Sequence, residues 1–416
     1  MVMAENKSIL YAGSISAGKG KPSASVTGNG DGIYTLEIDS ECRLKKISCV
    51  PSENSGIITE WNGKYVYAAN EVKDFTGLNG SGGGVSAYKI EEDGTLSFLN
   101  DSISYGARTS YVSVSESGKY LLASNHGSHS TVTCHYVQDE SGKWVLQRGF
   151  DDSSIAVFAL KEDGSIGELT DLKIFKGSGY WCHGGGQSTS HLHCVKIRND
   201  LVVACNRGCD CLEVMRLDEE TGKLTVLERF ETAPGLAPRH AVFHPEKNYL
   251  YVVNENYPCV SVFEINEETG LLSFVQTVEV MEEDYYKERP LPSFTKRHAD
   301  SEEKNTSGFG DRGAVMCSDI HISSNGKHLY VSNRCFAETG SLSVLDVNED
   351  GTLVLKQVYP LEGNDPRGFN LNQEGTFLSV SLLDQNLIEI FELDEKGMIK
   401  KKKGELQVSS PGSIIA

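Results

Sequence analysis

The stretch that decides the fold is GLAPRHAVFHPEKNYLYVVNENYPCVSVFEINEETG, residues 235–270. It holds three short apolar segments, around Ala241, at Tyr249–Val253 and at Cys259–Ile265, separated by turns rich in Asn, Glu, Pro and Gly. Short runs rich in Val, Tyr and Phe between turn residues are typical of β-strands, whereas helices need longer segments with another period. The stretch therefore predicts a series of short strands joined by turns.

The same order of strands and turns recurs along most of the chain. One copy precedes the stretch and reads HLHCVKI, LVVAC, CLEVMRL and LTVLERF, and two follow it, reading SDIHISS, HLYVS, SLSVLDV, LVLKQVY and then RGFNLNQ, TFLSVSL, LIEIFEL, MIKKKK. Six four-stranded units can be counted, with three strands left over at the N-terminus and one at the C-terminus. We expect the leftover strands to form a seventh sheet, so the prediction is an all-β, seven-bladed β-propeller closed by both chain ends. A two-sheet sandwich is the alternative, but it would not need so many equivalent units.

Residues 1–416 are expected to form a single propeller domain with two insertions. The first, Thr131 to Phe150, reads as a hairpin that interrupts one repeat. The second, Glu282 to Arg312, mixes acidic and basic residues with Pro290 and Pro292 and has no strand pattern. We expect it to be a long surface loop or a partial helix.

The charge balance excludes some classes of partner. With 39 Lys and Arg against 58 Asp and Glu, the formal net charge is −19. Nucleic acid or an anionic membrane would repel such a chain unless basic residues were concentrated, and the one basic run, Lys400–Lys403, is short. The N-terminus, MVMAENKSILYAG, has no long apolar region. We therefore expect neither a signal peptide nor a membrane anchor there, and we predict a cytoplasmic protein.

Cysteines suggest one possible metal site. Of the 11 cysteines, Cys205, Cys209 and Cys211 cluster in CNRGCDC. This spacing lacks the two separated CxxC knuckles that zinc sites commonly have. We expect reduced, buried cysteines and no bound metal.

Polar residues recur at fixed places in the repeat. His191 and His193 begin one unit, and Arg239 and His240 begin the next. Second strands end in Asn followed by a residue of varying charge, in the pairs Asn70-Glu71, Asn125-His126, Asn206-Arg207, Asn254-Glu255 and Asn333-Arg334. Asn is therefore expected to be a structural turn device, and the variable residue after it suits a binding site. Taken singly, each residue also has a structural explanation, as an ion pair or a packing imidazole.

Three segments carry a family resemblance: APRHAVFHPEKNYLYVVNE, SDIHISSNGKHLYVSNR and DPRGFNLNQEGTFL. They resemble the signatures of the lactonase family of seven-bladed propellers, which includes cycloisomerase-type 6-phosphogluconolactonases and carboxy-cis,cis-muconate lactonising enzymes. The resemblance covers nearly the whole chain and implies a site on one propeller face with no metal or other cofactor. Matched motif by motif, it implies four catalytic residues: His193, Arg239, Glu255 and Arg334. One departure is His191-Leu192-His193, where the family usually has His-Pro-His.

The residues suit lactone hydrolysis. This reaction needs a proton acceptor for water and a cation for the developing oxyanion. His193 can take the proton and Arg239 or Arg334 can hold the oxyanion, while Glu255 either orients an arginine or is itself the base. A phosphorylated or carboxylated substrate needs a second cationic clamp, for which Arg207 and Arg367 are expected at equivalent rim positions. His191 and His240 complete the expected substrate-binding set.

We therefore expect a hydrolase of 6-phospho-D-glucono-1,5-lactone in the pentose phosphate route, acting on a small anionic lactone. A lactonising cycloisomerase of the muconate type, or a lactonase for another sugar, is the alternative. A third reading is a non-catalytic propeller that binds a protein partner. Propellers of the WD type show repeated Gly-His and Trp-Asp signatures, which this chain, with only Trp61, Trp144 and Trp181, does not.

Overall fold

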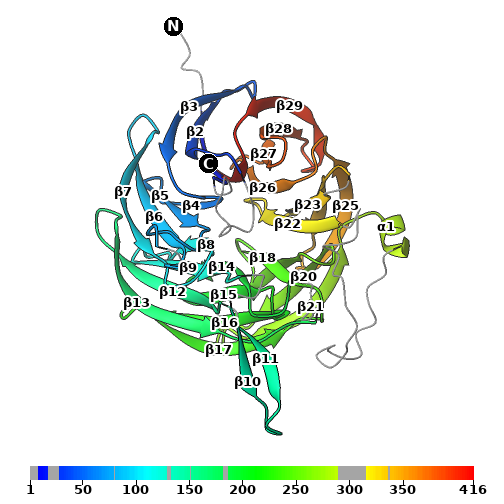
Figure 1. Cartoon of the computed structure of the whole chain (residues 1–416). Coiled ribbons are helices and arrows are strands. Elements are labelled where there is room, and N and C mark those ends of the chain that lie inside the picture. Colours follow the sequence, from blue (N-terminus) through cyan, green and yellow to red (C-terminus); the bar gives the residue numbers. More distant parts are fainter. Residues whose placement is uncertain are drawn as a thin grey trace.

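The computed structural model of the chain describes residues 8–16, 28–78, 80–128, 133–149, 151–180, 186–288, 315–335 and 338–416. Within them, seven four-stranded antiparallel sheets are arranged as blades in a ring (Figure 1). The predicted all-β, seven-bladed propeller is confirmed. The strands are short, most of them five to eight residues, as the short apolar runs of the sequence predict.

Each blade runs from an innermost strand near the axis to an outermost strand at the rim (Figure 1). Blade 1 contains β4 (Ile57–Trp61), β5 (Tyr65–Asn70), β6 (Gly84–Ile90) and β7 (Leu96–Ile103). Blade 2 contains β8 (Thr109–Val114), β9 (Tyr120–Asn125), β12 (Ser153–Leu160) and β13 (Ile166–Phe175). Blade 3 contains β14 (Leu192–Arg198), β15 (Leu201–Asn206), β16 (Cys211–Asp218) and β17 (Lys223–Glu231).

The opening stretch of the sequence forms most of blade 4. This blade contains β18 (Pro238–Phe243), β19 (Tyr249–Asn254), β20 (Cys259–Ile265) and β21 (Leu272–Glu279). Blade 5 contains β22 (Val315–Ile322), β23 (His328–Cys335), β24 (Ser341–Val347) and β25 (Leu353–Pro360). Blade 6 contains β26 (Pro366–Leu371), β27 (Phe377–Leu382), β28 (Leu387–Leu393) and β29 (Ile399–Gln407).

Blade 7 joins the two ends of the chain. It contains β30 (Pro411–Ile415), β1 (Ser8–Ser14), β2 (Gly32–Ile38) and β3 (Leu44–Pro51), with the C-terminal strand innermost. Strand β30 pairs with β1 through Ala12↔Ile414 and Tyr11↔Ile415. The predicted closure of the ring by both ends is confirmed, because β30 gives the blade that contains the N-terminal strands its fourth and innermost strand.

Shortening the chain tests this closure. A chain that ends at Ser409 is expected to lose at least about 2 kcal/mol of unfolding free energy, because Ile414, only 1% exposed, leaves the core. The loss should also expose the inner edge of β1 and promote aggregation. Urea unfolding measures the first effect and light scattering the second. A chain that lacks only the exposed Ala416 is the control, and an equal urea midpoint for both chains would contradict the role of β30.

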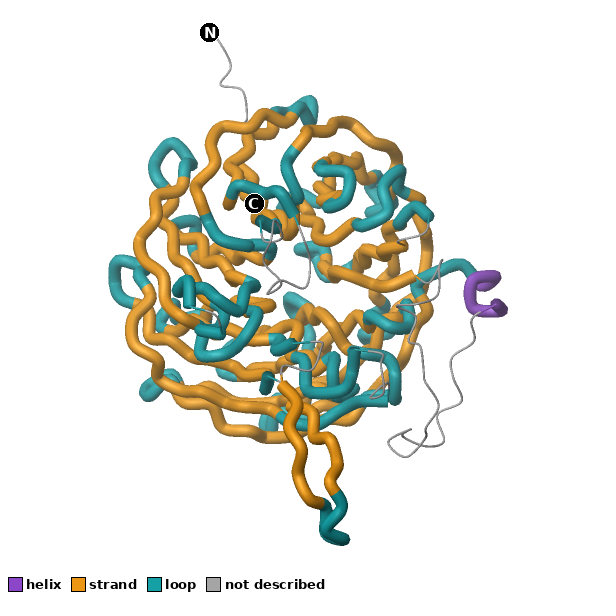
Figure 2. Tube along the Cα trace, in the orientation of Figure 1, coloured by secondary structure: helices purple, strands orange, loops and turns teal. Residues whose placement is uncertain are grey.

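Two elements stand outside the ring. Strands β10 (Thr133–Gln138) and β11 (Trp144–Gly149) pair as a hairpin that extends away from the blades (Figures 1 and 2). This is where a hairpin is predicted, although residues 131, 132 and 150 lie outside the described residues. From the predicted Glu282–Arg312 segment, the structure describes helix α1 (Glu283–Glu288), and residues 289–312 lie outside the described part. No helix in the described ranges is long and apolar enough to cross a membrane.

The hydrophobic core lies between neighbouring blades. Val203, Leu212 and Val214 of blade 3, for example, form one buried cluster with Leu250 and Val252 of blade 4. Each sheet is apolar on both faces of its inner strands, so it becomes buried only when a blade lies on each side. The packing of the blades in a ring therefore determines the positions of the polar residues at the ends of the inner strands.

The recurring asparagine of blades 1 to 5 bonds the second strand of its blade to neighbouring segments. In blades 4 and 5 the buried amide donates to a serine of the third strand, from Asn254 Nδ2 to Ser261 Oγ at 3.0 Å and from Asn333 Nδ2 to Ser343 Oγ at 2.7 Å. Blade 3 has Glu213 at this place, and its Oε1 accepts from Asn206 Nδ2 at 3.0 Å. The asparagines therefore have a structural role, but they are strand residues that bond to the third strand, whereas a turn device was predicted.

Candidate active site

The site begins with β-bulges on the innermost strands. The register of β14 shifts between Leu192 and Cys194, that of β18 between Pro238 and His240, and that of β26 between Pro366 and Gly368. The residue without a partner in the register is His193 in β14, Arg239 in β18 and Arg367 in β26. A bulge bends its strand locally and re-aims the side chain of the extra residue. The same backbone feature therefore presents a predicted site residue in three different blades.

The second strands bring the other charged residues to the same end. Antiparallel pairing places Asn254 opposite Pro238, so Glu255 follows β19 beside the bulge of its own blade. Its main-chain N–H donates to Ala237 O at 2.8 Å. Arg207 follows β15 in the same way, and Arg334 lies near the end of β23. All eight predicted residues lie at this end of the strands: His191, His193, Arg207, Arg239, His240, Glu255, Arg334 and Arg367.

One predicted equivalence is wrong. Arg207 and Arg367 are both near the strand ends, but Arg207 follows a second strand whereas Arg367 is a bulge residue of an innermost strand. Arg367 is therefore the counterpart of Arg239. Its side chain is partly exposed, while Arg207 is 1% exposed.

Glu255 lies at the centre of three guanidinium groups. Its Oε2 is 2.8 Å from Arg207 Nε and 3.3 Å from Arg239 Nε, and its Oε1 is 3.3 Å from Arg334 Nη2. All four side chains are buried. These residues come from blades 3, 4 and 5, so the carboxylate ties three blades together at the site. We call this group the arginine cluster.

The electrostatics of the arginine cluster favour an ionised carboxylate. Burial alone would raise the pKa of Glu255, but the three guanidinium charges hold that pKa below its ordinary value. Burial, together with the charge of Arg334, lowers the pKa of Arg239 to about 9, and Arg367 acts in the same direction. Asp365 Oδ1 lies 4.0 Å from Arg334 Nε, so the three guanidinium groups have two carboxylates near them, and the excess of positive charge suits an anionic ligand or a developing oxyanion.

The two histidines of the His-x-His element differ in their surroundings. His191 is fully buried, its Nδ1 lies 3.0 Å from His126 O, and its ring stacks on that of His126 at 4.5 Å. His193 is partly exposed, and its Nδ1 has no hydrogen-bond partner in the described part of the chain. Burial, followed by the charge of Arg239, holds the pKa of His193 well below its ordinary value. His193 is therefore neutral at pH 7 and can accept a proton.

His240 connects Arg239 to an aspartate that the sequence prediction did not include. His240 Nδ1 lies 2.8 Å from Asp319 Oδ1, and His240 Nε2 lies 3.2 Å from Arg239 Nη1. A guanidinium can only donate, so Nε2 must carry the lone pair and Nδ1 the proton that Asp319 accepts. Burial and then Arg239 lower the pKa of His240 to about 4, which keeps the ring neutral. This chain of hydrogen bonds positions Arg239.

Three residues join the site that the sequence prediction left out: Arg108, His126 and Asp319. His126 follows Asn125 as Glu255 follows Asn254, so the repeat of Asn pairs contained the signal for it. Arg108 is 7% exposed and its carbonyl accepts from the His126 N–H at 2.9 Å. Asp319 lies within the register shift of β22, between Cys317 and Ile320, which the sequence does not reveal.

The clustered cysteines are buried, as predicted. Cys205, Cys209 and Cys211 are free and fully buried, and Cys194 lies directly opposite Cys205 in the β14–β15 pair. Among the described residues, no group of three or more His, Cys, Asp or Glu side chains is placed to hold a metal ion.

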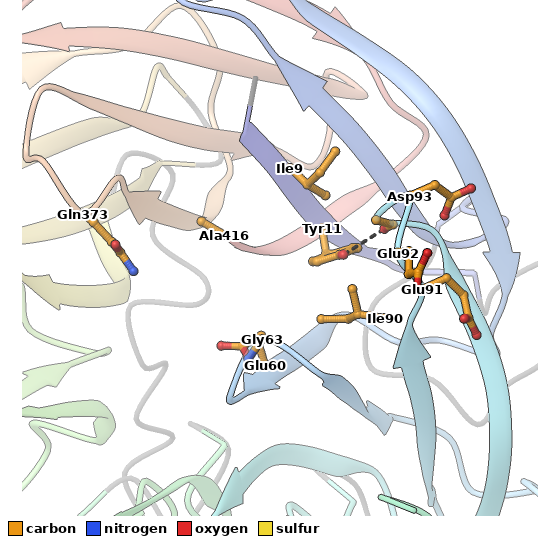
Figure 3. Close-up of a pocket in the computed structure, with 11 residues that line it drawn as sticks. Ile9, Tyr11, Glu60, Gly63, Ile90, Glu91, Glu92, Asp93, Gln373 and Ala416 are labelled. Atoms are coloured by element: carbon orange, nitrogen blue, oxygen red, sulfur yellow. Dashed lines mark hydrogen bonds between the residues drawn. The ribbon is translucent and has the colours of Figure 1, made fainter. Parts of the chain in front are cut away.

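A cavity of about 530 Å³ lies elsewhere, between blades 7 and 1 (Figure 3). Its lining includes Glu60, Glu91, Glu92 and Asp93, and Tyr11 donates to Gly94 O at 2.8 Å. It lies by the turns after β4 and β6, at the strand ends opposite to Asn70. Its carboxylates make it unsuitable for an anionic substrate.

The ring and the arginine cluster define a seven-bladed propeller with a charged site at one end of its innermost strands. The comparison with protein families identifies it further. The chain belongs to the lactonase family of seven-bladed β-propellers, whose sequence model, described as "Lactonase, 7-bladed beta-propeller", matches residues 9–133 and 128–416.

Similar proteins cover almost the whole chain. A 6-phosphogluconolactonase of Formosa agariphila is 28% identical over 396 residues, which is 92% of this chain and 95% of the relative. That of Bacillus subtilis is 27% identical over 376 residues, 89% of each chain. The solved structure of a candidate 6-phosphogluconolactonase from Bacteroides fragilis is 25% identical, with a TM-score of 0.74 over 98% of this chain and 97% of the other. The periplasmic gluconolactonase of Pseudomonas aeruginosa shares the fold, at 20% identity and a TM-score of 0.75 over 98% of each chain.

Proposed function

We propose that this protein is a lactone hydrolase that opens 6-phospho-D-glucono-1,5-lactone to 6-phosphogluconate. The observation that carries the proposal is the arginine cluster beside His193, a neutral and partly exposed imidazole. The family and the names of its relatives support the same reaction class.

In the proposed mechanism, His193 acts as the general base. It takes a proton from water as the water oxygen attacks the lactone carbonyl, and Arg239 and Arg334 stabilise the oxyanion that develops. When the tetrahedral intermediate collapses, the ring oxygen leaves and takes the proton back from His193. The products are a hydroxyl and a carboxylic acid, which ionises at neutral pH.

Glu255 has an orienting role in this proposal. Both carboxylate oxygens of Glu255 are already in contact with guanidinium groups, whereas Nδ1 of His193 has no partner in the described part of the chain. The contacts of Glu255 instead fix the directions of Arg239 and Arg334. Arg207 and His191 are buried and hydrogen-bonded to neighbouring groups, so their role is to hold other site residues in place. Arg367 is partly exposed and can contact the substrate.

Hydrolysis of freshly prepared phospholactone tests the proposal. The wild-type protein should accelerate hydrolysis above the spontaneous rate, and His193→Gln should lower kcat by about 10²–10⁴-fold, the usual contribution of a general base. His328→Gln, which changes a histidine bonded to Asp346 on a second strand, is the matched control. A wild-type protein that turned over carboxymuconate but not the phospholactone would refute the proposal. A fully active His193→Gln variant would refute the assignment of the base.

A further inference from the structure

One cation near the propeller axis is not used by the mechanism above. Lys196 lies on β14, three residues after His193, and its side chain is partly exposed. Its Nζ lies over the ring of Tyr111, 4.8 Å from the ring centroid. In the ranges that the structure describes, no carboxylate oxygen lies within 4.0 Å of this ammonium group. Lys196 is therefore a cation without a direct ionic partner there, in a protein whose formal net charge is −19.

Lys196 and Tyr111 are both in the protonation state that binds an anion. Burial opposes the charge of Lys196, whereas the nearby carboxylate of Asp319 favours the ammonium form and acts to raise its pKa. Burial raises the pKa of Tyr111 to about 12, so its hydroxyl keeps its proton. An ammonium with three donors beside a phenolic O–H is a suitable pair for the oxygens of a phosphate group.

This pair is connected to the proposed catalytic residues. The ring of Tyr111 meets the ring of His240 at 5.2 Å, and His240 meets His193 at 5.1 Å. Along β14, three residues separate the Cα atoms of His193 and Lys196 by about 10 Å, and the lysine side chain reaches back towards Tyr111. Like Arg239, Lys196 therefore lies on an innermost strand, but farther along the strand than His193.

We propose that Lys196 and Tyr111 form the subsite for the phosphate group of the substrate. The proposal rests on the proposed function, in which the arginine cluster handles the lactone carbonyl. In the 1,5-lactone the ring oxygen joins the carbonyl carbon C1 to C5, and the phosphate is carried on C6, outside the ring. The phosphate is therefore several bonds away from the carbonyl, and a second cationic group can bind it while the arginine cluster contacts the carbonyl oxygen. Arg207 cannot readily take the second role, because its Nε is bonded to Glu255 and its Nη1 to Gly186 O at 2.9 Å. Arg367 lies beside Arg239, at the carbonyl end, and is the comparison residue.

The test compares two lactones that differ only in the phosphate. For each protein, kcat/KM is measured with 6-phospho-D-glucono-1,5-lactone and with unphosphorylated D-glucono-1,5-lactone. Lys196→Met is expected to lower the ratio of the two values by about 10–100-fold, mainly through KM, because a charge-assisted contact is lost. Lys196→Arg should retain part of the preference. Lys89→Met, which removes an exposed lysine of β6, should leave the ratio unchanged.

The outcomes separate this subsite from the proposed function. An equal loss on both lactones, or a loss of preference in Arg367→Met but not in Lys196→Met, overturns the subsite. Calorimetry with 6-phosphogluconate and with inorganic phosphate gives a readout that needs no turnover, and Lys196→Met should weaken both by at least about 10-fold. A wild-type protein without lactonase activity would refute the proposed function alone, and equal affinities of wild type and variant would refute the subsite alone. Thermal unfolding of each variant checks that the fold is kept.

Discussion

Replacing Arg239 with alanine is expected to lower kcat for lactone hydrolysis by about 10²–10³-fold, the usual effect of removing one preorganised oxyanion donor. The guanidinium is 2% exposed and is held by Glu255, His240 and the carbonyl of Ser318, so it is oriented before the substrate binds. Arg239→Lys should recover only a small part of the rate, because a single ammonium cannot make the same set of directed contacts.

The measurement is the enzymatic rate after subtraction of the spontaneous hydrolysis. The control is Arg43→Ala, because Arg43 is an exposed arginine paired with Asp39 and Glu41 on the surface. This variant should keep the full rate, since exposed pairs contribute little. Full activity of Arg239→Ala would contradict the proposed role of the arginine cluster in catalysis, but it would not affect the assignment of the fold.

Replacing Glu255 with alanine is expected to cost about 3–5 kcal/mol of unfolding free energy, the usual effect of breaking a buried ionic group from one side. The substitution leaves three buried guanidinium groups without their common carboxylate. Glu255→Gln keeps the volume but not the charge, so it should cost less while it still lowers kcat. Urea unfolding of these variants, with Glu264→Ala on the exposed face of β20 as control, measures the difference. A change below about 1 kcal/mol for Glu255→Ala would contradict the central place of this carboxylate.

The same carboxylate predicts a pH dependence. The pKa of Glu255 is lower in the folded protein than the ordinary value of about 4.3. Its contribution to stability is therefore complete above about pH 4.3 and is lost as the pH falls towards the folded pKa. The stability difference between wild type and Glu255→Gln should accordingly be constant near neutral pH and should shrink below about pH 4. A difference that grew on acidification would contradict this assignment.

The fold could be predicted from the sequence because every blade repeats the same local pattern. Segments such as Tyr249–Val253 and Cys259–Ile265 are too short for helices and are bounded by turn residues, so the strands could be counted directly. The closure followed from the unmatched strands at the two ends. The ring arrangement could be predicted from this pattern alone, because the apolar faces of each sheet become buried only against the neighbouring blades.

The site could be predicted as a set of positions but not as a set of contacts. The position of Glu255 after its Asn follows from the repeat, whereas its contacts with Arg207 and Arg334 depend on how adjacent blades are rotated about the axis. The bulges were also invisible, because a strand with one extra residue reads like any other strand. For this reason Arg367 could not be assigned to an innermost strand, and Asp319 was not recognised.

The pairing of β30 with β1 also determines the order in which the protein can mature. The two strands are separated by almost the whole chain, and at roughly 5–20 residues per second a ribosome needs on the order of 20–80 s between them. Throughout this time β1 has no inner partner, and its backbone donors and acceptors can pair with another nascent chain. The ring can therefore close only after the segment of β30 has been synthesised, which makes Pro411–Ile415 the part of the chain that completes the fold.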